Sequence, residues 1–111
     1  MDQVQYSDFE KIEIRTGTIV SAEPFPEARK PAVKMVIDFG DFGSRKSSAQ
    51  ITDHYQPEEL VGKQVVAVVN FPPRQVANFM SECLVLGAVN ASGQVVLLHP
   101  DMPVENGLRI L

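Results

Sequence analysis

The side chains best suited to chemistry lie in one polar break between two apolar runs. Residues 70–82 separate Val65–Val69 from Cys83–Leu86 and bring aromatic, amide, guanidinium and hydroxyl groups together in the chain. The consecutive prolines Pro72 and Pro73 cannot donate hydrogen bonds to a sheet, so the first run must end before them. A loop that only joins two strands is usually shorter and less varied. We therefore expect residues 70–82 to form a binding site on a stiff loop.

A purely structural role for this loop is the alternative. Phe71, Phe79 and Met80 would then close one end of a barrel, and Arg74 would pair with a carboxylate. For each residue taken alone, this alternative stays open. For the loop as a whole, the combination of aromatic, amide and guanidinium groups favours a binding site.

Residues that could catalyse a reaction or hold a metal are sparse. The histidines are His54 and His99, which lie in no spacing typical of a zinc site, and the sequence has no CxxC pair. It also lacks a P-loop, a GxGxxG turn and a GxSxG nucleophile motif. Cys83 lies within an apolar run, which predicts a buried and unreactive thiol. We expect no enzyme, no catalytic residue, no metal and no cofactor.

The composition indicates one soluble domain spanning residues 1–111. Hydrophobic residues make up 44% of the chain and charged residues 22%, which are ordinary values for a globular protein with one modest core. No apolar run is long enough to cross a bilayer, and the acidic, polar N-terminus lacks the features of a signal peptide. A single cysteine provides no disulfide framework, so we expect a reducing, cytoplasmic location.

The net charge of −4 argues against indiscriminate nucleic-acid binding, which depends on neutralising phosphates. The charge is unevenly distributed along the chain. The stretch from Arg29 to Arg74 contains seven basic residues and five acidic ones. The acidic excess therefore lies in the two end segments. This distribution allows a local basic surface that selects shaped anionic ligands.

Short strands are expected to position these side chains. Apolar patterns broken by glycine and proline predict strands at Lys11–Ala22, Ala32–Phe39, Lys46–Ile51, Val65–Val69, Cys83–Leu86 and Gln94–Leu98, with an edge strand at Leu108–Leu111. The runs at 65–69 and 83–86 contain no glycine or proline, which is typical of strands buried on both faces. Gly17, within the first strand, predicts a bulge or a sharp bend.

Two short helices are expected outside the strands. Ser7 and Glu10 match a capping box that would begin a helix near the N-terminus. Residues Thr52–Val61 predict another, with Pro57 suited to its first turn and Gly62 to its C-terminal cap. Strands follow one another without long helices, which argues against a parallel βαβ architecture. We expect an all-β, five-stranded OB-fold barrel with a short helix between its third and fourth strands.

Three stretches of the sequence resemble a known family. They are IEIRTGTIVSAEPFPEARKP, KSSAQIT–HY–PEELVGKQVVAVVNFPPRQ and FMSECLVLG, and together they resemble the CsaA-type, export-related chaperones. That group is a stand-alone version of the tRNA-binding domain also appended to methionyl-tRNA synthetases. The resemblance, from about Phe9 to Leu111, implies an OB-fold with short terminal extensions and a cytoplasmic homodimer. It also implies binding of unfolded polypeptides or preproteins linked to protein export, with tRNA as a second candidate partner.

The resemblance further implies which residues bind the ligand. It assigns a shared peptide- or tRNA-binding face to Lys46, Ser48, Gln50, Asn70, Phe71, Arg74, Phe79, Ser81 and Glu82. One departure bears on the ligand: the tRNA-binding relatives follow the serine with glycine and methionine, whereas Ser81 is followed here by Glu82 and Cys83. Added bulk and a negative charge weaken the expectation of tRNA binding and leave the peptide expectation intact.

We therefore expect a homodimer that binds unfolded polypeptide without catalysis, with a structure-selective tRNA-binding protein as the alternative. Phe71, Phe79 and Met80 would form an adaptable apolar pocket, and amide side chains would hydrogen-bond to an extended backbone. For tRNA, the same aromatic rings would stack on bases, while Arg74 and Lys46 would hold phosphate. The apolar residues of Val4–Phe9 and Leu108–Leu111 are the expected dimer contact, and closing the barrel is the alternative role for these two segments.

Overall fold

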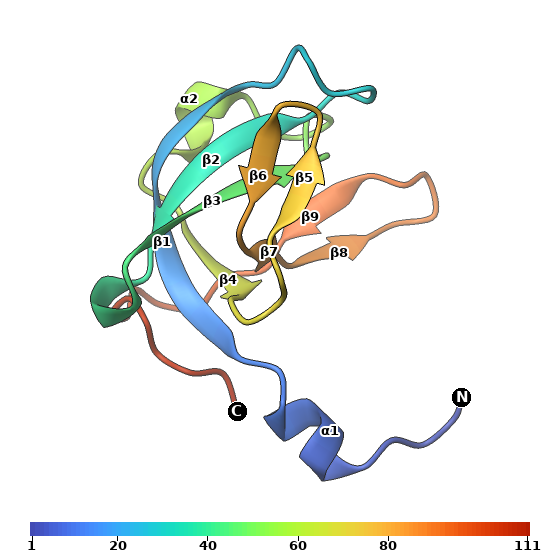
Figure 1. Ribbon diagram of the computed structural model, residues 1–111, viewed down its shortest axis with the longest axis vertical. Helices are drawn as coiled ribbons and strands as arrows, with labels where there is room; N and C mark the ends of the chain where they lie inside the picture. Colours follow the sequence, from blue (N-terminus) through green and yellow to red (C-terminus); the bar gives the residue numbers. More distant parts are fainter.

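Strands dominate the computed structural model, which describes residues 1–111 (Figure 1). The strands are β1 (Ile14–Pro24), β2 (Val33–Asp38), β3 (Ser44–Ala49), β4 (Gln64–Val68), β5 (Arg74–Val76), β6 (Phe79–Ser81), β7 (Leu84–Val85), β8 (Gly87–Val89) and β9 (Val95–Leu97). Three short helices accompany them: α1 (Tyr6–Glu10) before β1, the 3-10 helix η1 (Gly40–Phe42) before β3, and α2 (Pro57–Leu60) before β4.

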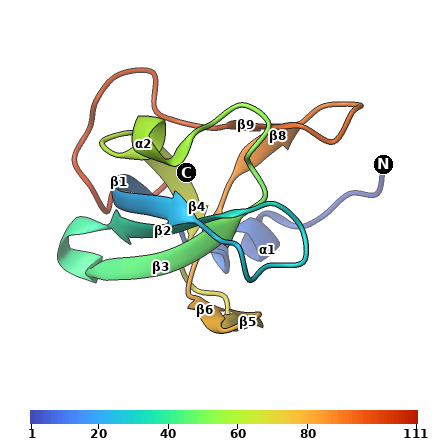
Figure 2. The ribbon, with the colours of Figure 1, turned by 90° about the horizontal axis from the view of Figure 1, so that it is seen from above.

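The five main strands form one antiparallel sheet in the order β3-β2-β1-β4-β7. The long strand β1 pairs with β4 along its first half and with β2 along its second half. The sheet curls so that its outer strands, β3 and β7, come into contact and nearly close a barrel (Figures 1 and 2). With α2 between β3 and β4, this arrangement confirms the predicted OB-fold.

The barrel interior is filled by apolar side chains that alternate along β2 and run continuously along β4. Val33, Met35 and Ile37 are buried on β2, and half-buried residues separate them. All residues from Val65 to Val69 are buried, which confirms the prediction for this run. Leu60 of α2 is fully buried against the same core. Burying each such side chain stabilises the fold by about 1.5–3 kcal/mol.

The second apolar run is less buried than predicted. Cys83 is buried, but Leu84 is 48% exposed, and Val85 and Leu86 are half-buried. The reason is that β7 is an outer strand of the sheet and pairs only with β4. The expectation that residues 83–86 are buried on both faces is therefore wrong.

The polar break between the two runs contains a hairpin of its own. Strands β5 and β6 pair in a register that sets Arg74 opposite Ser81 and Val76 opposite Phe79. Ala77 makes the turn with a φ of 51°, in the left-handed region. The hairpin projects from the barrel beside β3 (Figure 2). The expected stiff loop is thus partly a regular element.

Gly17 is required by close packing rather than by a bulge. A Cβ atom at Gly17 would lie 2.7 Å from side-chain atoms of both Ile37 and Phe39. The irregularity in β1 falls later, between Ile19 and Ser21, where the register with β2 shifts. The predicted bulge therefore exists in this strand, but its position was wrong.

The N-terminal helix α1 is capped differently from the prediction. Gln5 occupies the N-cap, and its backbone N–H donates to the Asp8 carboxylate over 3.1 Å. The expected capping box at Ser7 and Glu10 is therefore wrong by two positions, because the polar residues around it offer several equivalent caps. No helix in the structure is long and apolar enough to span a membrane.

The C-terminal segment lies along β1 without forming the expected strand. Arg109 makes a single β-bridge with Arg15. The Ile110 N–H donates to the Ile14 carbonyl over 2.8 Å. The expected edge strand at Leu108–Leu111 is thus reduced to a bridge and adjoining hydrogen bonds. The strand predicted near residues 94–98 does form, as β9, but it pairs with β8 in a separate hairpin.

Candidate ligand-binding site

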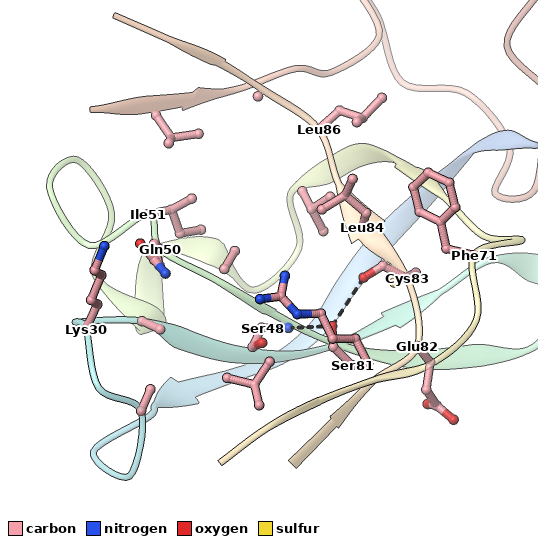
Figure 3. A pocket seen from close by; sticks show the side chains of 18 of the residues that line it. Lys30, Ser48, Gln50, Ile51, Phe71, Ser81, Glu82, Cys83, Leu84 and Leu86 are labelled. Atoms are coloured by element: carbon pink, nitrogen blue, oxygen red, sulfur yellow. Dashed lines mark hydrogen bonds between the residues drawn. The ribbon is translucent and has the colours of Figure 1, made fainter. Parts of the chain in front are cut away.

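An open cavity lies at the rim of the barrel, between the end of β3 and β7 (Figure 3). Its volume is about 1280 Å³, and 13 of its 22 lining residues are apolar. The walls come from the loop before β2, the end of β3, the residues after β4, the β5–β6 hairpin, β7 and the β8–β9 hairpin. Ligand cavities usually measure about 300–1,000 Å³. This one therefore has room for several residues of a guest chain.

Six of the nine predicted site residues line this cavity. They come from three segments: the end of β3 with the residue after it, the residues from the end of β4 to the start of β5, and the end of β6 with the residue after it. The six are Ser48, Gln50, Phe71, Arg74, Ser81 and Glu82. The fold therefore brings most of the predicted set to one place.

Phe71 supplies exposed aromatic surface to the cavity. It is separated from the end of β4 by Val69 and Asn70, and it precedes Pro72 and Pro73, whose rings restrict the backbone at this point. The Phe71 side chain is 47% exposed, and Leu84, which also lines the cavity, is 48% exposed. Two large apolar side chains left open to solvent in one cavity are typical of a binding surface.

Ser81 and Glu82 form hydrogen bonds with β3 at the place where the barrel closes between β3 and β7, and they also line the cavity. The Ser48 N–H donates to Ser81 Oγ over 3.3 Å, and Ser81 Oγ donates to the Cys83 carbonyl over 3.3 Å (Figure 3). The Lys46 N–H donates to the Glu82 carboxylate over 2.9 Å, and the Glu82 N–H donates back to the Lys46 carbonyl over 2.7 Å. Both side chains already have partners within the protein, so they shape the cavity.

Lys46 and Phe79 lie outside the cavity. The Phe79 ring packs edge-on against buried Phe25, with centroids 5.5 Å apart at 62°. The ammonium groups of Lys46 and Lys34 lie 5.2 and 5.7 Å from the Phe79 ring centroid. Aromatic and cation–π contacts of this kind contribute about 0.5–1.5 kcal/mol each. These residues therefore anchor the β5–β6 hairpin to the barrel.

Asn70 and Met80 also lie outside the cavity. Asn70 Oδ1 accepts a hydrogen bond from the Glu13 N–H over 2.9 Å, and Asn70 Nδ2 donates to the Lys11 carbonyl over 2.7 Å. These bonds fasten the segment before β1 to the end of β4. Met80 lies on the hairpin and is 41% exposed.

Two walls of the cavity carry no predicted residue. The loop before β2 contributes Arg29 and Lys30, and these lie between Pro26 and Pro31, a pattern that indicates an exposed, charged loop. The other wall is apolar and includes Ile51, β7 and the β8–β9 hairpin. The sequence of this wall gave no indication that its residues line a binding site, because the run that contains β7 predicts a strand buried on both faces.

The thiol at the cavity wall is buried, as predicted. Burial raises the pKa of the Cys83 thiol from 9.0 to about 11, against the opposing effect of a hydrogen bond with Ser47. A thiol must lose its proton to act as a nucleophile. What the cavity offers a ligand is apolar surface and the basic side chains of Arg29, Lys30 and Arg74.

Comparison with known proteins connects this geometry to a family. Residues 14–109 match the family described as a putative tRNA binding domain. The crystal structure of the CsaA chaperone from Bacillus anthracis is 53% identical, with a TM-score of 0.95, and covers 99% of this chain and 100% of that one. The CsaA chaperone protein from Picrophilus torridus is also 53% identical, with a TM-score of 0.91 over 98% and 100% of the two chains.

Curated relatives with the same domain are much longer proteins. A methionine–tRNA ligase from Methanocaldococcus jannaschii is 36% identical over 99% of this chain but only 17% of its own length. The chain thus spans about a sixth of the length of the curated relatives that it matches. The chain belongs to the putative tRNA binding domain family, in which it is similar over nearly its whole length to the CsaA chaperones, as its sequence predicted.

Proposed function

We propose that this protein binds non-native polypeptide, without catalysis, through the cavity at the barrel rim. The observation that supports this most directly is an open space of about 1280 Å³ whose lining is more than half apolar. Unfolded chains expose apolar side chains, and covering them gains about 25 cal/mol for each Å² removed from water. The similarity to CsaA chaperones supports the same function.

The cavity suits many guest sequences rather than one. Its apolar lining sets no directional requirement, because burial of apolar surface is non-directional. Phe71 and Leu84 are the exposed apolar contacts, and Gln50 and Arg74 add polar groups at the rim. We assign guest contact to these residues and support of the wall to Ser81 and Glu82.

The family resemblance supports the cellular setting of this proposal. We propose that residues 1–111 act as one domain in the cytoplasm, and that its guests include preproteins destined for export. No cofactor or metal takes part.

Binding of tRNA is the second candidate function, and the family match favours it. Arg29, Lys30 and Arg74 at the cavity could hold phosphate, and Phe71 could stack on a base. Against this, the chain carries a net charge of −4, and Glu82 adds a negative group to the cavity wall. We therefore rank polypeptide first.

Salt dependence separates the two candidates. Fluorescence anisotropy would compare a labelled, permanently unfolded client protein with labelled tRNA in dilute and moderate sodium chloride. Contacts to several phosphates make affinity fall at least about 10-fold over such a range, because bound counterions are released. Client binding to an apolar cavity should change about 2-fold or less.

The two outcomes are distinct. Binding of the client that persists in moderate salt supports the proposal. Tight, salt-sensitive capture of tRNA together with no capture of client would replace it with the second candidate.

A homodimer forms part of the proposal. Apolar side chains near both chain ends are exposed in the single chain: Val4, Tyr6, Leu108 and Leu111. Helix α1 stands away from the barrel (Figure 1). Burial of these side chains against a second copy would remove them from water. Two cavities on one dimer would also raise the effective affinity for a long unfolded chain.

A further inference from the structure

The outer edge of β3 is paired along only part of its length. Its inner edge forms a full ladder with β2. On its outer edge, Lys46 exchanges backbone and carboxylate hydrogen bonds with Glu82, and the Ser48 N–H donates to Ser81 Oγ. In an antiparallel strand the groups that face one edge recur every second residue. The backbone of residues 46 and 48 therefore faces the outer edge, and the same alternation, continued past the end of β3 at Ala49, directs the backbone of residue 50 to that edge as well.

Gln50 is the point at which this edge becomes free. Neither the N–H nor the C=O of Gln50 has a hydrogen-bond partner within the protein. The residue is exposed, and it lines the cavity (Figure 3). An unpaired donor and acceptor on a sheet edge form a template for another extended strand.

Apolar surface lies directly beside this free edge. Ile51 follows Gln50 and is buried, while Val85, Leu86 and Val95 line the facing walls. Successive side chains of an extended strand point to opposite faces. A strand added at Gln50 would therefore direct every second side chain into the cavity.

The charge around the free edge is positive. Arg74 lies opposite Ser81, the residue that receives the Ser48 N–H, and Arg29 and Lys30 line the cavity from the loop before β2. None of these three cations forms an ion pair within the protein. The one acidic residue of the lining, Glu82, already accepts a hydrogen bond from the backbone. Charge complementarity therefore favours an occupant that carries a carboxylate.

We propose that the occupant of the cavity is an extended polypeptide segment that adds as a strand to the free edge of β3 at Gln50. Its alternate apolar side chains enter the cavity, and a carboxylate of the segment faces Arg29 and Lys30. Main-chain pairing gives affinity without a sequence requirement, and the pockets and charges then select among segments. This inference rests on the proposed binding of polypeptide and specifies how that polypeptide is held.

Backbone methylation of the guest tests the pairing. The probe is a fluorescein-labelled octapeptide of alternating leucine and serine that ends in aspartate. Two derivatives carry N-methyl groups on the leucines or on the serines, so that each removes the N–H groups of one edge of the strand. We expect one derivative to lose at least 10-fold in affinity and the other to stay within 3-fold of the parent. Equal affinity of all three peptides, or equal loss in both derivatives, overturns the added strand.

The matching change in the protein is Gln50→Pro, with Gln50→Ala as its control. Proline removes the N–H of this residue but fits an extended backbone, whereas alanine keeps the N–H and removes only the side chain. We expect Gln50→Pro to weaken the parent peptide at least 5-fold more than Gln50→Ala does, because alanine removes only the side-chain contact. Equal losses in the two variants overturn the added strand. Thermal melting checks that both variants fold. If Gln50→Pro does not fold, the methylated peptides decide the question alone.

Replacing the peptide's aspartate with lysine tests the carboxylate. We expect the unaltered protein to bind the lysine peptide at least 5-fold more weakly than the aspartate peptide. When Arg29 and Lys30 are both changed to alanine, the difference in affinity between the two peptides should become smaller. Equal or tighter binding of the lysine peptide overturns this part of the inference. A labelled oligouridylate serves as the nucleic-acid comparison. If the double variant loses oligouridylate binding but keeps the aspartate peptide unchanged, these cations serve nucleic acid and the carboxylate assignment is wrong.

Failure of the inference and failure of the proposed function give different results. If the parent peptide binds and depends on Phe71 but ignores methylation, polypeptide binding stands and the added strand is wrong. If neither the parent peptide nor an unfolded client binds at all, the proposed function is wrong, and the inference falls with it.

Discussion

At the scale of single residues, two exposed apolar side chains near the double proline differ in one respect. Phe71 is 47% exposed and lines the cavity, whereas Met80 is 41% exposed and does not. We predict that Phe71→Ala weakens client binding about 10-fold, because truncating a side chain that anchors a binding site costs more than about 1 kcal/mol. Met80→Ala should change it about 2-fold or less. Fluorescence anisotropy with an unfolded client measures the affinity of both variants. Equal losses of affinity would indicate non-specific adsorption to exposed apolar surface instead of binding in the cavity.

Cys83 gives a second prediction at this scale. Its folded pKa of about 11 lies above the value of 9.0 for an unburied thiol, so at neutral pH the folded protein holds roughly 100-fold less thiolate. Labelling by a thiol reagent should be correspondingly slow in buffer and fast in denaturant. Because the folded pKa is raised, folding stability should be constant at neutral pH and decline as the pH rises from about 9 to 11. Rapid labelling of the folded protein would contradict the burial of this side chain.

Residue types identify which side chains can bind, but not which of them face the ligand. Phe71 and Phe79 have the same chemistry and lie in the same stretch. The turn at Ala77 returns Phe79 to the barrel, where it packs against Phe25. Neither the turn nor that distant partner is visible in the local sequence. Lys46 and Asn70 lie outside the cavity for the same reason, because the partners that hold them are far away in the chain.

At the scale of elements, Asn70 links the end of β4 to the segment before β1. We predict that Asn70→Ala destabilises the protein by about 1 kcal/mol through the loss of its bonds to Glu13 and Lys11, and that it leaves client affinity unchanged. Urea unfolding and client anisotropy measure the two effects. If the Asn70→Ala variant lost client affinity markedly and kept normal stability, Asn70 would be a ligand-binding residue.

Periodicity identified most of the strands but not their neighbours. The continuous apolar run of β4 indicated burial on both faces, and residues Val65 to Val69 are indeed buried, in a strand that lies between β1 and β7. The run that contains β7 reads the same way, yet β7 is an outer strand and Leu84 is exposed. Local sequence cannot distinguish a central strand from an outer one, because that difference is made by pairing with residues elsewhere.

At the scale of the whole molecule, the fold was predictable and the cavity only in part. Five strands without long helices, with one short helix between the third and fourth, leave few arrangements other than an OB-fold. The cavity needs three further elements that meet only in space: the loop before β2, the β5–β6 hairpin and the β8–β9 hairpin. No single stretch of sequence predicts that these three elements lie next to one another.

The proposed dimer gives a prediction at this scale. Deleting residues 1–8 removes the exposed side chains of Val4 and Tyr6, while β1 and the barrel remain. We predict that sedimentation velocity shows a dimer for the full chain and a shift towards monomer for the shortened one, because less apolar surface is left to bury. A dimer that persists after the deletion would assign the contact to other residues.

The hydrogen bonds that close the barrel between β3 and β7 have a consequence for the size of the cavity opening. Where the barrel closes beside β3, one hydrogen bond joins two backbone groups, from the Glu82 N–H to the Lys46 carbonyl. The others run through side chains, from Ser47 Oγ to the Cys83 carbonyl and from the backbone of β3 to Ser81 and Glu82. Ser81 and Glu82 lie outside the five-stranded sheet, so substitutions at these two positions should alter the width of the cavity opening and leave that sheet in place. One sheet can therefore serve cavity openings of different widths.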